Sequence, residues 1–155
     1  MDAVDFGLGD DPAVTFVQGD TFTADIPADH FDAIWVSNFL EHLLSQEQVA
    51  QFLELMCSKL KPGGRIAIMG PNFKYCHREY FDFADHTVAL SHIGVAEHVV
   101  GAGFELEKVT SRFLPYSFRG RLPAGRSLVR RYLNSPWAWR FLGKQFLVVA
   151  RRPNS

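Results

Sequence analysis

Two polar pairs stand close together in the first half of the chain and could take part in binding or acid–base chemistry. Ser37 and Asn38 end a short apolar run, and Glu41 and His42 follow soon after. Histidine titrates near neutral pH, so His42 could act as a general base or contact a substrate. Alternatively, Glu41 and His42 only open a helix, and the residue types alone leave both interpretations open.

The segments that must position these residues are a strand, a helix and a second strand. Residues 31–36 form an apolar run that is typical of a strand buried on both faces. Ser45 can cap a helix whose apolar stripe then recurs at spacings of three and four. The stripe consists of Val49, Phe52, Leu53, Met56 and Leu60.

The turn Pro62-Gly63-Gly64 ends this helix, and residues 65–69 form the second strand. Two buried strands joined by a helix should be parallel, with a right-handed crossover. Ligands of such sheets bind at the carboxyl ends of the strands. Besides the two polar pairs, Asn72 and Tyr75 are expected near that edge.

The segments FDAIWVSNFLEHL and LKPGGRIAIMGPN resemble two motifs of class I S-adenosylmethionine-dependent methyltransferases, one after strand four and one around strand five. The resemblance runs from about Val4 to Pro153 and is closest to the small-molecule branch, methyltransferase type 11, which includes the ubiquinone-biosynthesis O-methyltransferases. It implies a single α/β domain over 1–155, with a Rossmann-like, doubly wound, mostly parallel sheet and an antiparallel edge strand at 144–150. It also implies S-adenosyl-L-methionine as cofactor and methyl transfer to a small-molecule acceptor.

The amino-terminal residues depart from the family pattern, because the glycine-rich first turn is reduced to Gly7-x-Gly9. These glycines could be a degraded form of that turn, or residues 3–5 could end strand two. We favour the second interpretation, because too few residues follow for a crossover. Asp5 would then hold the ribose hydroxyls, and the family's first strand and helix would be missing. A non-catalytic or truncated remnant that lacks a complete cofactor site is therefore the alternative function.

The resemblance assigns further cofactor contacts after strands three and four. Residues 14–18 are expected to form strand three, followed by Asp20 beside the adenine amino group and by Thr21 and Phe22 at the border of the ring. Ser37 and Asn38 would lie near the methionine end of the cofactor. From residue types alone, Asp20 is more simply a residue that caps a turn.

The acceptor side is expected to follow strand five. In the family this aromatic-rich region, residues 73–83, forms part of the lid over the substrate, and Asn72 and Tyr75 are our candidates for binding it. If the acceptor is a hydroxyl, His42 or His86 could remove its proton. The ubiquinone-pathway relatives hold a divalent cation with an acid at the place of Asn38; because an amide is a poorer ligand, we expect no metal.

A sheet without its first strand would expose an apolar edge on residues 31–36. We expect either that residues 14–18 move beside this strand, or that a second copy of the chain covers it as a homodimer.

Composition excludes several partners and compartments. The 155 residues carry a net charge of −1, which gives no strong field for nucleic acid. No apolar run is long enough for an integral membrane segment, and the acidic amino terminus does not have the pattern of a signal peptide. The expected location is the cytoplasm.

The last third of the chain should contain a helix over 91–104, capped by Ser91, and a strand over 105–116. The helix should turn its apolar stripe inward: Ile93, Ala96, Val99 and Val100. A basic segment, 119–131, precedes a short amphipathic helix. We favour a solvated excursion for this stretch, while contact with a membrane or a phosphate group stays open.

Overall fold

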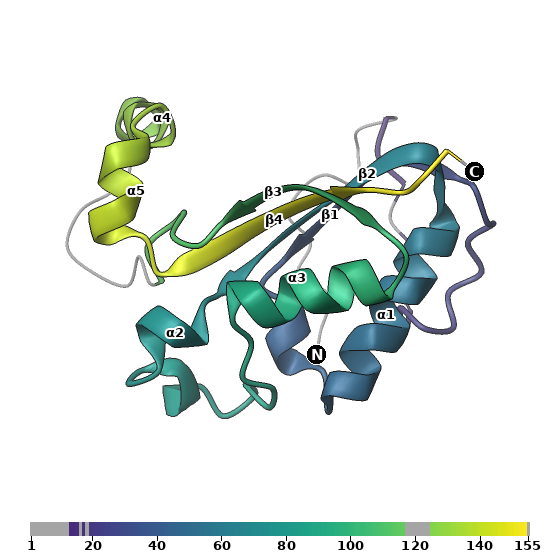
Figure 1. The fold of residues 1–155 in the computed structure, drawn as a ribbon, viewed down its shortest axis with the longest axis horizontal. Helices are drawn as coiled ribbons and strands as arrows, with labels where there is room; N and C mark the ends of the chain where they lie inside the picture. Colours follow the sequence, from purple (N-terminus) through teal and green to yellow (C-terminus); the bar gives the residue numbers. More distant parts are fainter. Residues whose placement is uncertain (1–12, 16, 18, 117–124, 155) are drawn as a thin grey trace.

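The computed structural model describes residues 13–15, 17, 19–116 and 125–154, and the predicted contacts of Asp5 lie outside this set. Within the described residues, four strands form one sheet, accompanied by five α-helices and two short 3₁₀ helices, η1 and η2 (Figure 1). In chain order the elements are β1 (Phe31–Ser37), η1 (Leu40–His42), α1 (Gln46–Lys59), β2 (Leu60–Pro71), α2 (Phe73–Cys76), η2 (Tyr80–Asp82), α3 (His92–Gly101), β3 (Glu105–Thr110), α4 (Arg126–Leu133), α5 (Pro136–Leu142) and β4 (Gln145–Arg151).

The strand–helix–strand unit predicted from the sequence is present. β1 pairs with β2 in parallel, with Ser37 opposite Met69 at the carboxyl end. Ser45 caps α1 by accepting a hydrogen bond from the backbone N–H of Gln48 at 3.1 Å. The Gln48 side chain in turn accepts from the N–H of Leu44, just before the cap, at 2.9 Å, so the cap residue and Gln48 secure the start of the helix together.

The sheet order is β1-β2-β4-β3, with β4 antiparallel to both of its neighbours. Three strands therefore run in one direction and β4 runs against them. The α/β class is confirmed, but the antiparallel strand is not at the edge as expected. It lies in the interior, and β3 forms the edge.

The prediction of a doubly wound sheet is not met by the described residues. α1 and α3 lie on the same face of the sheet (Figure 1). On the other face, the Trp35 side chain is 59% exposed. The apolar run over 31–36 suggested burial on both faces, but the described chain supplies only one helical layer.

Residues 14–18 do not form the expected strand three at those positions that the structure describes. Within the described residues, β1 pairs only with β2, so the described positions of 14–18 form no strand pairing with it. The segment that follows instead packs along α1: Phe22 contacts Phe52 with ring centroids 6.3 Å apart, and Lys59 donates a hydrogen bond to the Ile26 carbonyl. The homodimer stays a prediction.

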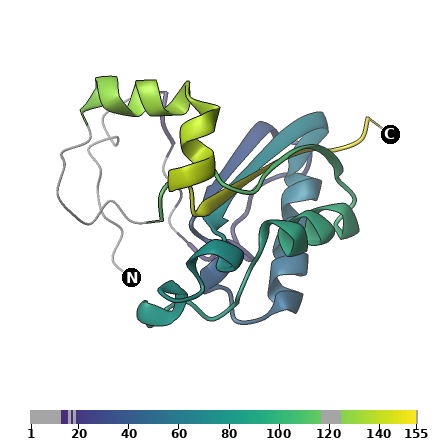
Figure 2. The same cartoon turned by 60° about the vertical axis from the view of Figure 1, so that its left-hand side comes forward.

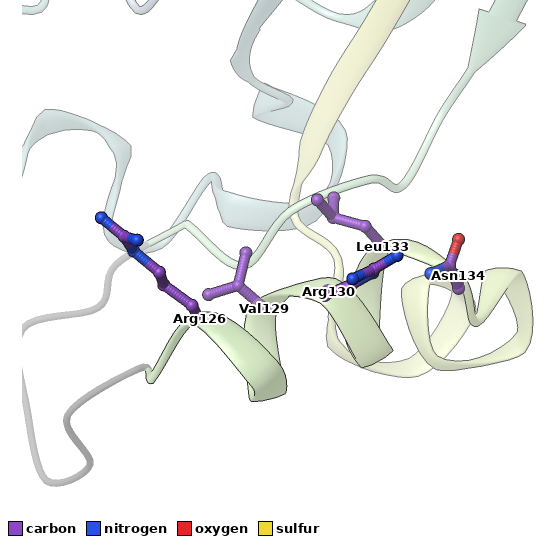
Figure 3. Close-up of a pocket in the computed structure, with 5 residues that line it drawn as sticks. All are labelled: Arg126, Val129, Arg130, Leu133 and Asn134. Atoms are coloured by element: carbon purple, nitrogen blue, oxygen red, sulfur yellow. The ribbon is translucent and has the colours of Figure 1, made fainter.

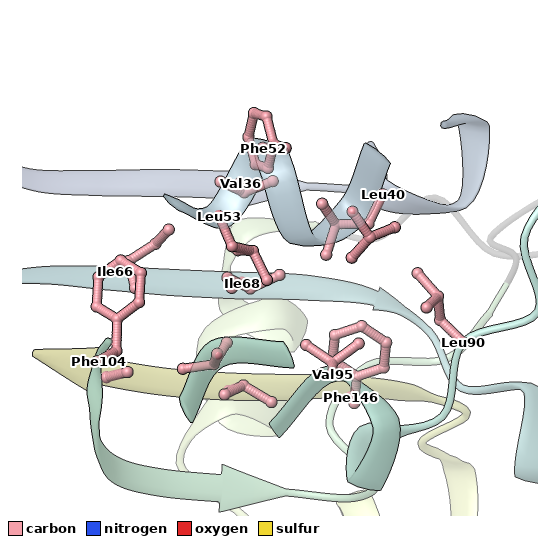
Figure 4. Packing of buried hydrophobic residues seen from close by; sticks show 14 of the residues in the cluster. Val36, Leu40, Phe52, Leu53, Ile66, Ile68, Leu90, Val95, Phe104 and Phe146 are labelled. Carbon is pink, nitrogen blue, oxygen red and sulfur yellow. The ribbon is translucent and has the colours of Figure 1, made fainter. Parts of the chain in front are cut away.

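The core lies between the sheet and the helices α1 and α3 (Figure 4). Ile66 and Ile68 of β2 are fully buried, as are Leu53 of α1 and Val95 of α3. Ser91 caps α3 as predicted. Its inward residues are Val95 and Val99, whereas Ile93 and Val100 are exposed, so the predicted stripe was partly wrong. β3 ends at Thr110 rather than at residue 116.

The Pro62-Gly63-Gly64 turn is part of β2 and holds the carboxyl-terminal residues. Gly63 has a φ of +76°, and a Cβ there would come within 2.6 Å of the Asn154 side chain. Backbone bonds join Gly63 N–H to the Arg152 carbonyl and Arg152 N–H to the Gly64 carbonyl. Only glycine combines this backbone conformation with this close approach. No helix in the described part of the chain is both long and apolar enough to cross a membrane.

Two leucines, one buried and one exposed, test the core. Leu53→Ala should lower the free energy of unfolding by about 2–5 kcal/mol, because the side chain is fully buried and leaves a cavity. Leu44→Ala is the control: that side chain is 74% exposed, and its loss should change stability by less than about 0.5 kcal/mol. Urea denaturation followed by circular dichroism measures both. Equal effects of the two substitutions would contradict this core.

Candidate functional site

The chain turns sharply where β1 ends. Asn38 has a φ of +48°, a left-handed conformation that asparagine tolerates better than most residues. Its backbone N–H donates to the Met69 carbonyl of β2 at 2.9 Å, and its side-chain amide donates to the Ser37 hydroxyl at 3.2 Å. This turn leaves Ser37 and Asn38 exposed at the carboxyl edge of the two parallel strands.

Asp20 caps a turn, as its residue type suggested. Its Oδ1 accepts from the Phe22 N–H at 2.7 Å, and its carbonyl accepts from the backbone N–H groups of Thr23 and Ala24. Asp20, Thr21 and Phe22 are all exposed. The second carboxylate oxygen of Asp20 has no hydrogen-bond partner among the described residues.

An aromatic contact joins this turn to the end of β1. Phe52 of α1 packs against Phe22. It also packs against Phe39, and the ring centroids of Phe52 and Phe39 are 4.9 Å apart. Phe39 directly follows Asn38. Phe52 therefore connects the segment that carries Asp20 with the segment that carries Ser37 and Asn38.

The two histidines predicted as catalytic lie side by side. The rings of His42 and His86 are 5.1 Å apart, although His42 ends η1 and His86 lies between η2 and α3. His42 Nδ1 lies 3.0 Å from the Asp85 carbonyl, and because a carbonyl only accepts, Nδ1 carries the proton in this contact. In the neutral ring Nε2 is then the basic nitrogen. The geometry fixes the tautomer that a general base needs.

His86 is held in an apolar, aromatic setting. Its ring packs against those of Tyr80 at 4.9 Å and Phe83 at 5.2 Å. Burial, followed by the charge of His42, lowers the pKa of His86. The Nδ1 atom of His86 is buried without a hydrogen-bond partner among the described residues. Burial therefore favours the neutral form of His86, whose Nδ1 lies inside the protein.

Glu41 is a site residue whose role the sequence left ambiguous. Its side chain is 2% exposed and lies over Gly70, where a Cβ would be 3.4 Å from Oε2. Glu41 Oε1 is 3.9 Å from His42 Nε2. Burial raises the pKa of Glu41 to about 7, against the opposing effects of a backbone hydrogen bond and of His42. A charged residue next to a histidine in the sequence gives no signal that its side chain is buried.

One cluster among the described residues could hold a metal ion. Glu41, His42 and His86 each offer a ligand atom, and these atoms all lie within 4.8 Å of one another. Imidazole and carboxylate ligands suit a transition metal such as zinc. The expectation of a metal-free site stays a prediction.

A cavity of about 360 Å³ lies close to His86, although neither histidine is part of its wall. Phe83 and Tyr116 belong to its wall and contact the ring of His86 at 5.2 and 6.4 Å. The Tyr116 hydroxyl is buried without a described hydrogen-bond partner, and burial raises its pKa to about 12. Lys144 and Glu79, also in the wall, form an ion pair at 2.6 Å. The cavity combines aromatic surface with a few polar groups, as small-molecule sites do.

Asn72 and Tyr75, the predicted substrate residues, have other contacts. Asn72 is fully buried and caps α2; its amide group donates to the Ser111 carbonyl at 2.8 Å and contacts His92 Nδ1 at 3.0 Å. Its Oδ1 accepts from the Lys74 N–H. All its hydrogen-bonding groups are used, so Asn72 is a structural residue here. Tyr75 stacks on His92 and lies under the Arg112 guanidinium, 4.1 Å from the ring centroid.

The raised pKa of Glu41 should make stability depend on pH. Because the folded state keeps the proton up to about pH 7, while the unfolded chain loses it near pH 4.5, stability should fall as pH rises through this interval, by up to about 3 kcal/mol. Glu41→Gln should remove that part of the decline. Urea denaturation of both proteins at several pH values measures it. Parallel curves for the two proteins would contradict the assignment.

Comparisons with known proteins agree with this fold. Residues 3–68 match the sequence model of the Methyltransf_11 family, described as a methyltransferase domain. No curated protein sequence matches the chain. Among solved structures, a SAM-dependent methyltransferase from Archaeoglobus fulgidus is similar, with a TM-score of 0.62 and 18% identity over 88% of this chain and 66% of that chain.

Two further structures show the same likeness. One is the complex of the Haloferax volcanii Trm112 methyltransferase activator with a methyltransferase, at TM-score 0.63 and 18% identity, covering 90% of this chain and 62% of that chain. The other is an S-adenosylmethionine-dependent methyltransferase from Mesorhizobium loti. Its TM-score is 0.64 and its sequence identity is 17%, and the match covers 94% of this chain and 73% of that chain. The chain spans less than two thirds of the length of the first two. Residues 3–68 thus resemble a methyltransferase domain in sequence, and the described part of the chain shares the fold of these solved structures.

Proposed function

We propose that this chain binds S-adenosyl-L-methionine and transfers its methyl group to a small-molecule acceptor. The observation that carries the proposal is the position of His42, a histidine of fixed tautomer that follows the carboxyl end of β1, close to Ser37 and Asn38. In sheets of this kind ligands bind at that edge. The cofactor supplies an activated methyl group, and the side chains bind, orient and accept a proton.

The described residues fit the adenine part of the cofactor by their chemistry. Asp20 has a free carboxylate oxygen that can accept from an exocyclic amine, and the rings of Phe22 and Phe39 supply apolar surface nearby. Ser37 and Asn38 add polar groups for the methionine end. Asp5, assigned to the ribose, lies outside the described residues, so that part of the fit rests on the family resemblance.

The acceptor is proposed to occupy the cavity beside Phe83 and Tyr116. Its aromatic wall favours a partly apolar acceptor, and the Tyr116 hydroxyl, which has no hydrogen-bond partner among the described residues, can hold a polar group of it. His42 Nε2 would accept the proton of an acceptor hydroxyl as the methyl group is transferred. Glu41, if ionised, stabilises the resulting imidazolium from 3.9 Å away. His86 would orient the acceptor.

Cofactor binding can be tested with S-adenosylhomocysteine by isothermal titration calorimetry. Wild-type protein should bind in the micromolar range. Asp20→Asn should weaken binding about tenfold or more, because Asn keeps the bond to the Phe22 N–H but replaces the free acceptor with a donor. Asp25→Asn, an exposed acid in the same loop, is the control and should bind like wild type. No heat at millimolar ligand with folded protein would favour the alternative, a non-catalytic chain.

Methyl transfer itself tests His42. Release of S-adenosylhomocysteine is measured with a panel of phenol, alcohol and carboxylate acceptors. With the best hydroxyl acceptor, His42→Gln should lower kcat by about 100-fold or more and remove the pH-dependent rise in rate that a general base causes. His77→Gln replaces an exposed histidine of the next loop and should leave kcat unchanged. A His42→Gln enzyme with the wild-type rate and pH profile would refute the role of His42.

A further inference from the structure

The charges of this chain are separated along the sequence in a way that the net charge of −1 conceals. All 17 aspartates and glutamates lie within residues 1–107, and 11 of the 16 lysines and arginines lie after residue 107. The carboxyl-terminal third is therefore strongly cationic. Among the described residues, some of these cations are paired with acids and others are not.

Most cations of this region that lie near the sheet are engaged by acids or rings. Arg151 pairs with Glu105 at 2.6 Å, Arg152 with Asp29 at 2.5 Å, and Lys144 with Glu79. The guanidinium groups of α4 and α5 differ: none of them forms an ion pair with any residue that the structure describes. These residues are Arg126, Arg130, Arg131 and Arg140.

The same two helices expose large apolar side chains. α4 has no buried residue, and α5 buries only Ala138. On α5, Trp137 and Phe141 are 71% and 73% exposed and stand one turn apart, with Arg140 beside them. Leu142 is also exposed. Such exposure of aromatic groups is unusual unless a partner covers them.

On α4, cationic and aliphatic side chains line one groove of about 530 Å³. Figure 3 shows Arg126, Val129 and Leu133 projecting from the same side of the helix. Arg130 and Asn134 complete the lining. Guanidinium groups next to aliphatic carbon suit a ligand that is anionic at one end and apolar at the other.

The two helices are anchored to the body of the protein on their other side. The Tyr132 hydroxyl donates to the Phe113 carbonyl at 2.6 Å, and the Trp139 indole donates to the Tyr132 carbonyl at 2.9 Å. Trp139 also packs edge-on against Phe113. α4 and α5 stand apart from the sheet and the α1–α3 layer (Figures 1 and 2). They form a projecting unit held in place at its base.

We propose that α4 and α5 form a docking surface for an anionic phospholipid bilayer. Arginines bind the phosphate groups, while Trp137 and Phe141 lie at the level of the headgroups and the aliphatic residues reach the acyl chains. Exposed aliphatic residues distinguish this partner from nucleic acid. Leu128, Val129 and Leu133 have no aromatic face on which a base could stack, but they gain from contact with hydrocarbon.

Co-sedimentation with vesicles tests this surface on the full chain. The protein should bind vesicles in which half of the lipid is phosphatidylglycerol, should not bind pure phosphatidylcholine, and should dissociate as salt is raised. Arg130→Gln with Arg131→Gln should weaken partitioning about tenfold or more, since each charge contributes separately. Trp137→Ser with Phe141→Ser should weaken it by a similar factor.

The control pair is Lys74→Gln with Arg78→Gln, which removes the same charge from two exposed positions elsewhere and should bind vesicles like wild type. Circular dichroism should show that all variants are folded. The proposal would be overturned if the protein did not bind the anionic vesicles, or if the control pair lost binding equally. It would also be overturned if single-stranded RNA released the protein from vesicles at a lower concentration than competing anionic lipid does. S-Adenosylhomocysteine binding should be unchanged in all variants, so the outcome is independent of the proposed methyl transfer.

Discussion

The parallel pairing of β1 with β2 is the constraint on which the rest of this structure depends. It brings Ser37 opposite Met69 and ends both strands at one edge, so the chain must turn there twice. The first turn, at Asn38, leads into η1 with Glu41 and His42, and the second, at Asn72, leads into α2. Burial of Ile66 and Ile68 against α1 and α3 holds this register, because a shift by one residue would expose them.

The elements with strong local signals were predictable. The Ser45 and Ser91 caps, the glycine turn and the parallel unit are present, since each depends on residues near in sequence. The predicted stripe lies on α1 as far as Met56, while its last member, Leu60, begins β2. Long-range features were less accessible. The position of β4 between β2 and β3 depends on pairing between distant segments. The described residues supply only one helical layer, and this changed which residues are buried. The apolar run of β1 cannot reveal that Trp35 lacks a covering helix.

In the candidate site, too, local features were predictable and long-range contacts were not. His42 and His86 were both selected for their chemistry, but their proximity depends on the loop between β2 and α3, which no local pattern specifies. Glu41 was missed as a buried acid because the sequence does not show that it lies over Gly70. Asn72 was selected for its place after a strand, a position that suits a ligand contact and a helix cap equally well. Only its hydrogen bonds distinguish the two roles.

The interior place of β4 has a consequence for biosynthesis. β2 and β3 are both made before β4, yet neither can complete its pairing until β4 arrives, as the partners Ile66 and Ala150 illustrate. A nascent chain therefore carries two incomplete strand edges and an open apolar layer until translation has passed the last strand. Such pairing between remote segments slows folding and leaves aggregation-prone intermediates. During this interval the chain should be a substrate for chaperones that bind exposed β-strands.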